Sequence, residues 1–101
     1  MILYNVTVGI DKEIENEWVV WMKETHIPKV MNSKVFVSYK FYKVLTHDDE
    51  NTVSFCVQYL THTIEDFNRY LKDFAPAMVA EHQQKYPGKH VAFRTLLEEV
   101  V

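Results

Sequence analysis

The chain has 101 residues, of which 48% are hydrophobic and 14% aromatic, and its net charge is −3 with neutral histidines. This length and composition fit one globular domain over residues 1–101. The negative charge argues against a nucleic-acid-binding module, which needs clustered Lys and Arg. The single cysteine, Cys56, excludes an internal disulfide and fits a reducing compartment.

The first residues alternate in polarity and lack the basic start of a signal peptide. No apolar run approaches the ~20 residues that span a membrane. We therefore expect a cytoplasmic protein with no membrane partner.

Residues 2–10 alternate with a period of two and predict a strand. An amphipathic helix follows, in which Ile14, Trp18 and Trp21 recur at helical spacing. Pro28 has no backbone N–H, so this helix is expected to kink or restart near residues 26–28 and to end by about residue 32. In this register Trp21 is expected to be mostly buried against the sheet.

Residues 35–45 and 52–60 predict two further strands, joined by a short acidic loop. Residues 90–100 predict the last strand.

Between the third and last strands, two helices are expected. Thr63 is a candidate N-cap, with Asp66 three residues later. Pro76 fits the first turn of the second helix. Gly88, directly after a proline, is expected to end that helix.

The order strand, helix, strand, strand, helix pair, strand predicts an α+β fold. With right-handed crossovers, β-α-β-β-α-β gives a ferredoxin-like four-stranded antiparallel sheet with its helices on one face. The strand order 4-1-3-2 places the first strand between the third and the fourth.

Strand alternation assigns Val91, Phe93 and Leu97 to the face under the helices, with Ala92, Arg94 and Leu96 on the outer face. The outer face is then too apolar for contact with water alone. Its large apolar residues are expected to be Leu3, Phe36, Val44, Leu60 and Leu96.

The simplest interpretation of this outer face is a homodimer in which two sheets face each other and close a barrel. In the alternative, a loop or the C-terminal segment covers the face in a monomer. On the first interpretation, replacing Phe36 or Leu96 by Asp is expected to dissociate or unfold the protein.

Five segments carry a resemblance: MILYNVTV at the N-terminus, W-x-x-W-M-K-E-x-H-I-P at 18–28, V-Q-Y at 57–59, A-P and A-E-H within 75–82, and AFRTLLE at 92–98. The chain resembles an uncharacterised family of short bacterial proteins labelled a domain of unknown function. That family is similar to the dimeric α/β-barrel superfamily, which includes cofactor-free monooxygenases, haem-degrading enzymes, small isomerases and stress-responsive barrels. The resemblance implies the fold, a dimer, and ligands between helices and sheet or in the barrel. Activity does not transfer by fold alone.

The sequence carries no zinc-ligand spacing, so we expect no metal site, and it carries no phosphate-binding glycine pattern. We expect no cofactor. Cys56 has no basic neighbour that would lower its pKa, so we expect a structural role for it. His47, His62 and His90 are expected to be exposed to solvent.

Asn5, Gln58 and Arg94 form the first candidate site, expected together on the outer, barrel-facing side. One guanidinium and two amides suit a carboxylate or enolate oxygen. The alternative is a hydrogen-bonded network that satisfies these groups across the dimer.

The second candidate site groups His26 with Tyr4, Trp21 and Tyr59. A histidine beside phenols and an indole suits a general base for an aromatic or enolisable substrate. The alternative is a core histidine bonded to a tyrosine. His82 either joins this group or faces water.

The sequence therefore favours a small homodimeric α/β-barrel protein that binds a small organic ligand in a helix–sheet cleft or in the barrel. One alternative is a structural or regulatory dimer without catalysis. Another is a cofactor-independent monooxygenase or isomerase that uses His26. A cleft of about 300 Å³ or more would favour an enzyme.

Overall fold

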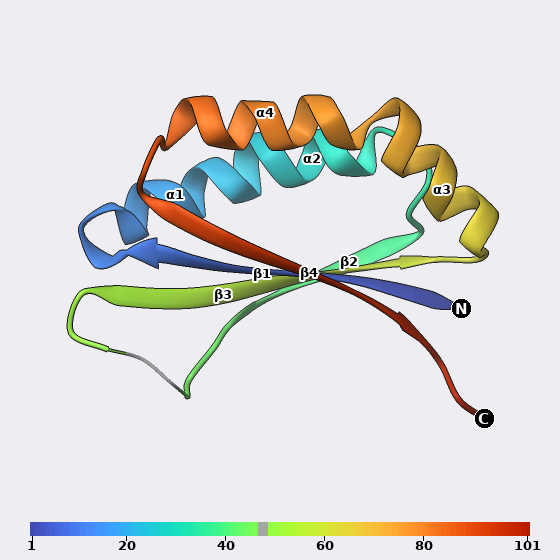
Figure 1. Cartoon of the computed structure of the whole chain (residues 1–101), viewed down its shortest axis with the longest axis horizontal. Coiled ribbons are helices and arrows are strands. Elements are labelled where there is room, and N and C mark those ends of the chain that lie inside the picture. Colours follow the sequence, from blue (N-terminus) through green and yellow to red (C-terminus); the bar gives the residue numbers. More distant parts are fainter. Residues whose placement is uncertain (47–48) are drawn as a thin grey trace.

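A four-stranded antiparallel sheet carries all of the helices on one face (Figure 1). The computed structural model describes residues 1–46 and 49–101. The sheet order is β2-β3-β1-β4, which confirms the ferredoxin-like fold and the central position of the first strand. The strands are β1 (Ile2–Asp11), β2 (Ser38–Lys43), β3 (Thr52–Thr61) and β4 (His90–Glu98).

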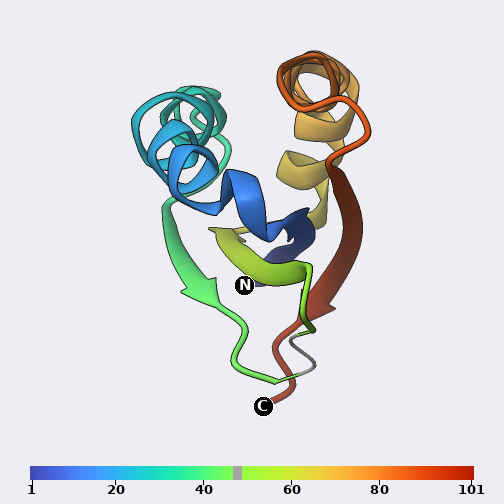
Figure 2. The same ribbon diagram turned by 90° about the vertical axis from the view of Figure 1, so that its left-hand side faces the viewer.

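The helices form two groups that lie side by side above the sheet, whereas the C-terminus lies on the other side (Figure 2). No helix among residues 1–46 and 49–101 has the length and hydropathy to cross a membrane. The first group is η1 (Lys12–Ile14), α1 (Glu15–Trp21), η2 (Met22–His26) and α2 (Ile27–Met31), and the second is α3 (Ile64–Asp73) and α4 (Ala75–Lys85).

The first helical group is interrupted where the sequence predicts, but by a wide turn rather than a break. The segment η2 is π-helical, and Pro28 lies in the first turn of α2. Such wide turns shift the residues that follow around the helix axis. The buried side chains of α1 and η2 are Trp18, Met22 and His26, whereas Trp21 is only half-buried. Trp21 is therefore less buried than expected, and Trp18 is the fully buried tryptophan of this helix.

The ends of the second helical group follow the predicted local signals. The Thr63 side chain accepts a hydrogen bond from the Asp66 backbone N–H at 3.1 Å, which caps α3. Pro76 lies in the first turn of α4. Gly88 has a φ of 71°, a left-handed conformation that glycine adopts without strain. The predicted N-cap of α3 is confirmed, and α4 ends at Lys85, ahead of Gly88, as predicted.

The face assignment of β4 was wrong. Pairing with β1 sets Leu96 opposite Tyr4, Arg94 opposite Val6 and Ala92 opposite Val8. The β1 partners face the helices, so these three β4 residues do as well. A shift of one residue exchanges the two faces of a strand. The outer face instead receives Val91, Phe93, Thr95 and Leu97.

Phe36 also lies elsewhere than predicted. The strand β2 begins only at Ser38, and the Phe36 ring lies 5.0 Å from that of Tyr59 and 4.9 Å from that of Tyr70. Phe36 is buried in the core beneath α3. Leu96 also lies on the helix side of the sheet, so replacing Phe36 by Asp would test the core, and replacing Leu96 by Asp would test the helix side of the sheet rather than an outer interface.

Candidate functional site

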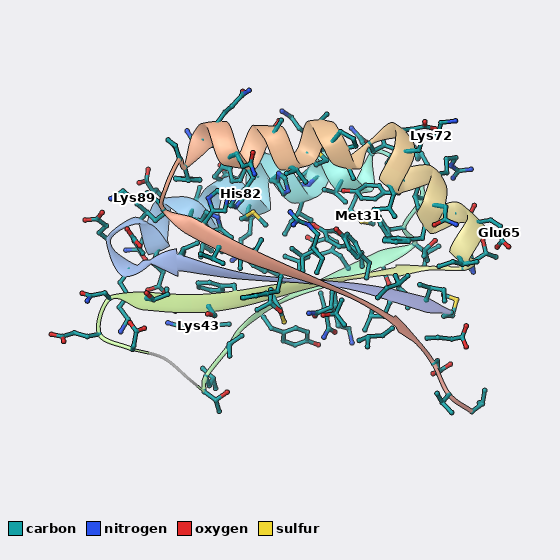
Figure 3. All side chains as sticks on the ribbon, viewed as in Figure 1. Met31, Lys43, Glu65, Lys72, His82 and Lys89 are labelled. Carbon is teal, nitrogen blue, oxygen red and sulfur yellow. The ribbon has the colours of Figure 1, made fainter. Side chains whose placement is uncertain are left out.

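A cavity of about 230 Å³ lies between the helices η2, α2 and α4 and the strands β1, β3 and β4. Aliphatic side chains form much of its wall. His82 marks its place in Figure 3, under α4 on the side that faces the sheet. At ~30 Å³ per water molecule, the cavity has room for a single substituted ring. Its polar lining consists of Tyr4, His26, Tyr59, Tyr70, His82, Gln83, His90 and Arg94.

One guanidinium and three phenols dominate the chemistry of this cavity. Arg94 is its one lining residue with a permanent charge in the described part of the chain. Burial raises the pKa of Tyr59 and of Tyr70. Burial also raises the pKa of Tyr4, and the nearby positive charge of Arg94 partly opposes this rise. The phenols therefore remain neutral hydrogen-bonding groups at neutral pH.

His82 has one ring nitrogen committed to the core. The indole N–H of Trp18, a fully buried residue, donates to Nε2 of His82 at 2.9 Å. The ring of His90 lies 4.0 Å away, centroid to centroid. Burial, with the nearby His90, His26 and Arg94, lowers the pKa of His82 from 6.5 to about 3. The ring is therefore neutral, with its proton on Nδ1.

This low pKa predicts an acid-sensitive stability. Between about pH 6.5 and 3 the unfolded chain binds a proton at His82 that the folded chain does not, so stability falls as the pH falls through this window. His82→Gln keeps an acceptor for the Trp18 N–H and removes the titration. We expect its free energy of unfolding, measured by urea denaturation, to decline less steeply with acid than that of the wild type. Parallel pH profiles of the two proteins would contradict the lowered pKa.

His90 was expected at the surface, but it is half-buried and lines the cavity. Its Nδ1 lies 2.9 Å from the backbone carbonyl oxygen of Tyr86, so an N–H at Nδ1 donates to that oxygen. His62 is exposed as predicted. His47 lies outside the described residues.

His26 is buried in the cavity wall and packs against Trp21, with the ring centroids 5.0 Å apart and the ring planes tilted by 30°. Its Nδ1 lies 3.6 Å from Oε1 of Glu81. Burial lowers the pKa of His26, and the charge of Glu81 opposes this fall. Within residues 1–46 and 49–101, no hydrogen bond joins the ring to a tyrosine hydroxyl, so the alternative of a core histidine bonded to a tyrosine was wrong.

The structure divides the predicted site residues between two faces. One cavity is lined by Tyr4, His26, Tyr59 and Arg94. Trp21 does not line this cavity but packs against the His26 ring. The other two predicted residues, Asn5 and Gln58, are opposite each other on the outer face. The predicted trio of Asn5, Gln58 and Arg94 was therefore wrong.

Glu81 and Tyr70 are two further site residues that the sequence reading missed. Glu81 reaches His26 from a different helix, and no spacing along the chain signals this contact. Tyr70 was predicted only as a residue of a helix face.

Candidate metal ligands and the single cysteine were also located in the described residues. No cluster of three or more His, Cys, Asp or Glu side chains suited to a metal ion occurs there. The half-buried Cys56 is on the outer face, and burial raises the pKa of its thiol.

Solved structures of other proteins share this fold almost end to end. HapK from Hahella chejuensis has a TM-score of 0.71 and 9% identity, with 99% of this chain and 93% of that chain covered. An ethyl tert-butyl ether D (EthD) family protein from Bacillus halodurans C-125 has a TM-score of 0.68 and 14% identity, with 99% and 100% covered. SnoaB, a cofactor-independent oxygenase from Streptomyces nogalater, has a TM-score of 0.56 and 13% identity, with 99% and 94% covered.

These similarities define the class of the protein. It has the ferredoxin-like fold of the dimeric α/β-barrel proteins, and identities this low establish the fold alone. The chain belongs to the family described as domain of unknown function DUF4286, whose model matches residues 1–100. No curated protein matches the chain.

Proposed function

We propose that this protein binds a small organic anion with one ring in the cavity between its helices and its sheet. The observation that carries this proposal is the placement of Arg94 among phenols and imidazoles in a cavity of about 230 Å³. A guanidinium binds a carboxylate or phenolate oxygen through charge-assisted hydrogen bonds.

The charge balance of the cavity supports an anionic ligand. In the described part of the chain, no carboxylate forms an ion pair with Arg94. Of the nearby acids, Glu81 pairs with Lys29. The positive charge of Arg94 is therefore available to an anionic group of the ligand. Aliphatic residues and neutral phenols would surround the ring of that ligand.

The volume of the cavity supports a compact ligand. It lies somewhat below the ~300 Å³ at which ligand pockets for larger molecules begin. That SnoaB is a cofactor-independent oxygenase on the same fold supports a small-molecule ligand over a purely structural dimer.

The outer face of the sheet supports a second part of the proposal, a homodimer. Val91 is 61% exposed and Phe93 67% exposed, and Leu97 lies on the same face. Exposed apolar patches of this kind mark interfaces. Two copies that face each other through these sheets would cover the patch and close a barrel.

Isothermal titration calorimetry with benzoate tests the ligand proposal, with benzamide as the neutral analogue. We expect benzoate to bind more tightly than benzamide, and Arg94→Gln to weaken benzoate binding about tenfold to a hundredfold. Arg69→Gln is the matched control, because Arg69 pairs with Asp66 on α3 and does not line the cavity. Equal binding of the two probes, or an Arg94→Gln variant that binds benzoate like the wild type, would contradict the proposal.

A further inference from the structure

Two buried polar atoms without hydrogen-bond partners face each other beside the cavity. They are Nδ1 of His26, on η2, and Oε1 of Glu81, on α4, and they lie 3.6 Å apart. A buried polar atom without a hydrogen bond lowers the stability of the folded protein. A proton on Nδ1 that is donated to Oε1 would satisfy both atoms. The pair therefore fits a proton on Nδ1 directed at the Glu81 carboxylate.

Glu81 is held in place to accept this proton. Its other oxygen, Oε2, accepts a hydrogen bond from the ammonium of Lys29, on α2. This bond lowers the pKa of Glu81, so the group is a carboxylate at neutral pH. A carboxylate behind an imidazole fixes the tautomer and stabilises the ring when it becomes charged.

With its proton on Nδ1, the His26 ring has an unprotonated Nε2 on the side away from Glu81. That ring lines the cavity. The two other imidazoles there already use a nitrogen in the core: Nε2 of His82 accepts from Trp18, and Nδ1 of His90 bonds to the Tyr86 carbonyl. Among the described cavity imidazoles, His26 is the one whose Nδ1 faces a carboxylate, that of Glu81.

We propose that His26 accepts a proton from the ligand and that Glu81 is the positioning residue for this step. The inference rests on the proposed function and narrows its ligand to a weak acid, a phenol or an enolisable ring, that is held as its anion. The proton leaves the ligand O–H or C–H bond for Nε2 of His26, and the bonding electron pair stays on the ligand. The phenolate or enolate then faces Arg94, and the imidazolium faces Glu81.

The charged groups around His26 favour this division of roles. Burial lowers the pKa of His26, Glu81 opposes this fall, and Lys29 and Arg94 add to it, so the ring is neutral before the ligand binds. His82, 5.8 Å away between ring centroids, is itself neutral. A bound anion would add a second negative charge and favour the imidazolium.

The probe is 4-nitrophenol, whose phenolate absorbs visible light and whose neutral form does not. The full-length protein is titrated with it at a pH below the pKa of the free phenol. Visible absorbance measures the ionised fraction, and NMR of the histidine ring nitrogens follows the proton. We expect 4-nitrophenol to bind as the phenolate while Nε2 of His26 becomes protonated.

Three variants separate the roles. His26→Asn is expected to bind the probe as the neutral phenol. Glu81→Gln is expected to lower the ratio of bound phenolate to bound phenol about tenfold or more, because the imidazolium loses its counter-charge. Lys29→Gln is the matched control, because it also breaks the ion pair between Lys29 and Glu81 but keeps the Glu81 carboxylate. We expect the fraction of probe that this variant binds as phenolate to be at least as high as in the wild type. NMR spectra of each variant verify that it is folded.

The outcomes distinguish the inference from the function on which it rests. Two results would contradict the proton-acceptor role of His26 without contradicting anion binding. The first is that 4-nitrophenol binds the wild type in its neutral form. The second is that it binds as the phenolate and that the phenolate fraction is unchanged in both His26→Asn and Glu81→Gln. Failure of both benzoate and 4-nitrophenol to bind the wild type would contradict the proposed function, and the inference with it.

Discussion

Replacing Trp18 by alanine is expected to lower the free energy of unfolding by about 3–5 kcal/mol, as the loss of a buried aromatic ring does. Trp18 is 0% exposed and packs on Phe55, with 5.2 Å between ring centroids. Its indole N–H also satisfies His82. Because a domain of this size is stable by only about 5–15 kcal/mol, the variant should be close to unfolding.

Trp21→Ala is the matched comparison, since it removes the same side chain one turn further along the helix. Trp21 is half-buried, so its loss should cost clearly less. Trp18→Phe keeps an aromatic ring but removes the N–H that donates to Nε2 of His82. We expect this variant to lose about 1–3 kcal/mol of the free energy of unfolding, less than Trp18→Ala loses. Chemical denaturation of the three variants measures these costs. A larger loss for Trp21→Ala than for Trp18→Ala would contradict the observed helix register.

Phe93→Asp is expected to convert a dimer into a monomer. Phe93 is 67% exposed in the single chain and sits at the centre of the apolar strip on the outer face of β4. Specific interfaces bury more than about 1,000 Å² in total, and a carboxylate in such an interface would lose its hydration without gaining a partner. The wild type should sediment at about 24 kDa, twice the chain mass of 12.0 kDa, and the variant as a single chain.

Leu71→Asp provides the control for this experiment. Leu71 is also a large exposed apolar residue, but it lies on α3, away from the outer face of the sheet. We expect it to leave the sedimentation of the dimer unchanged. A wild type that sediments at 12.0 kDa at micromolar concentration would contradict the dimer.

The sequence predicts the fold well because local signals agree with one another. The alternation in β1 and β3 is unambiguous, and Thr63 and Gly88 mark helix ends by chemistry that acts within a few residues. The strand β4 lacks such a signal, since apolar residues occupy both of its faces. Its register depends on pairing with β1, which the β4 sequence alone does not specify.

The candidate site was predictable only where it follows from strand order. Tyr4 and Tyr59 were expected as neighbours because β1 and β3 pair, and they are opposite each other. Glu81 could not be predicted beside His26, because that contact depends on how two helices pack on the sheet. Arg94 was identified as a functional candidate by its residue type but assigned to the wrong face.

The most direct test of the helix–sheet cavity as the binding site is a crystal structure of the protein grown with saturating benzoate. We predict electron density for the ring between α4 and the sheet, with its carboxylate within hydrogen-bonding distance of the Arg94 guanidinium. Benzoate bound between the two outer sheet faces, or a helix–sheet cavity that stays free of benzoate at saturation, would contradict the account.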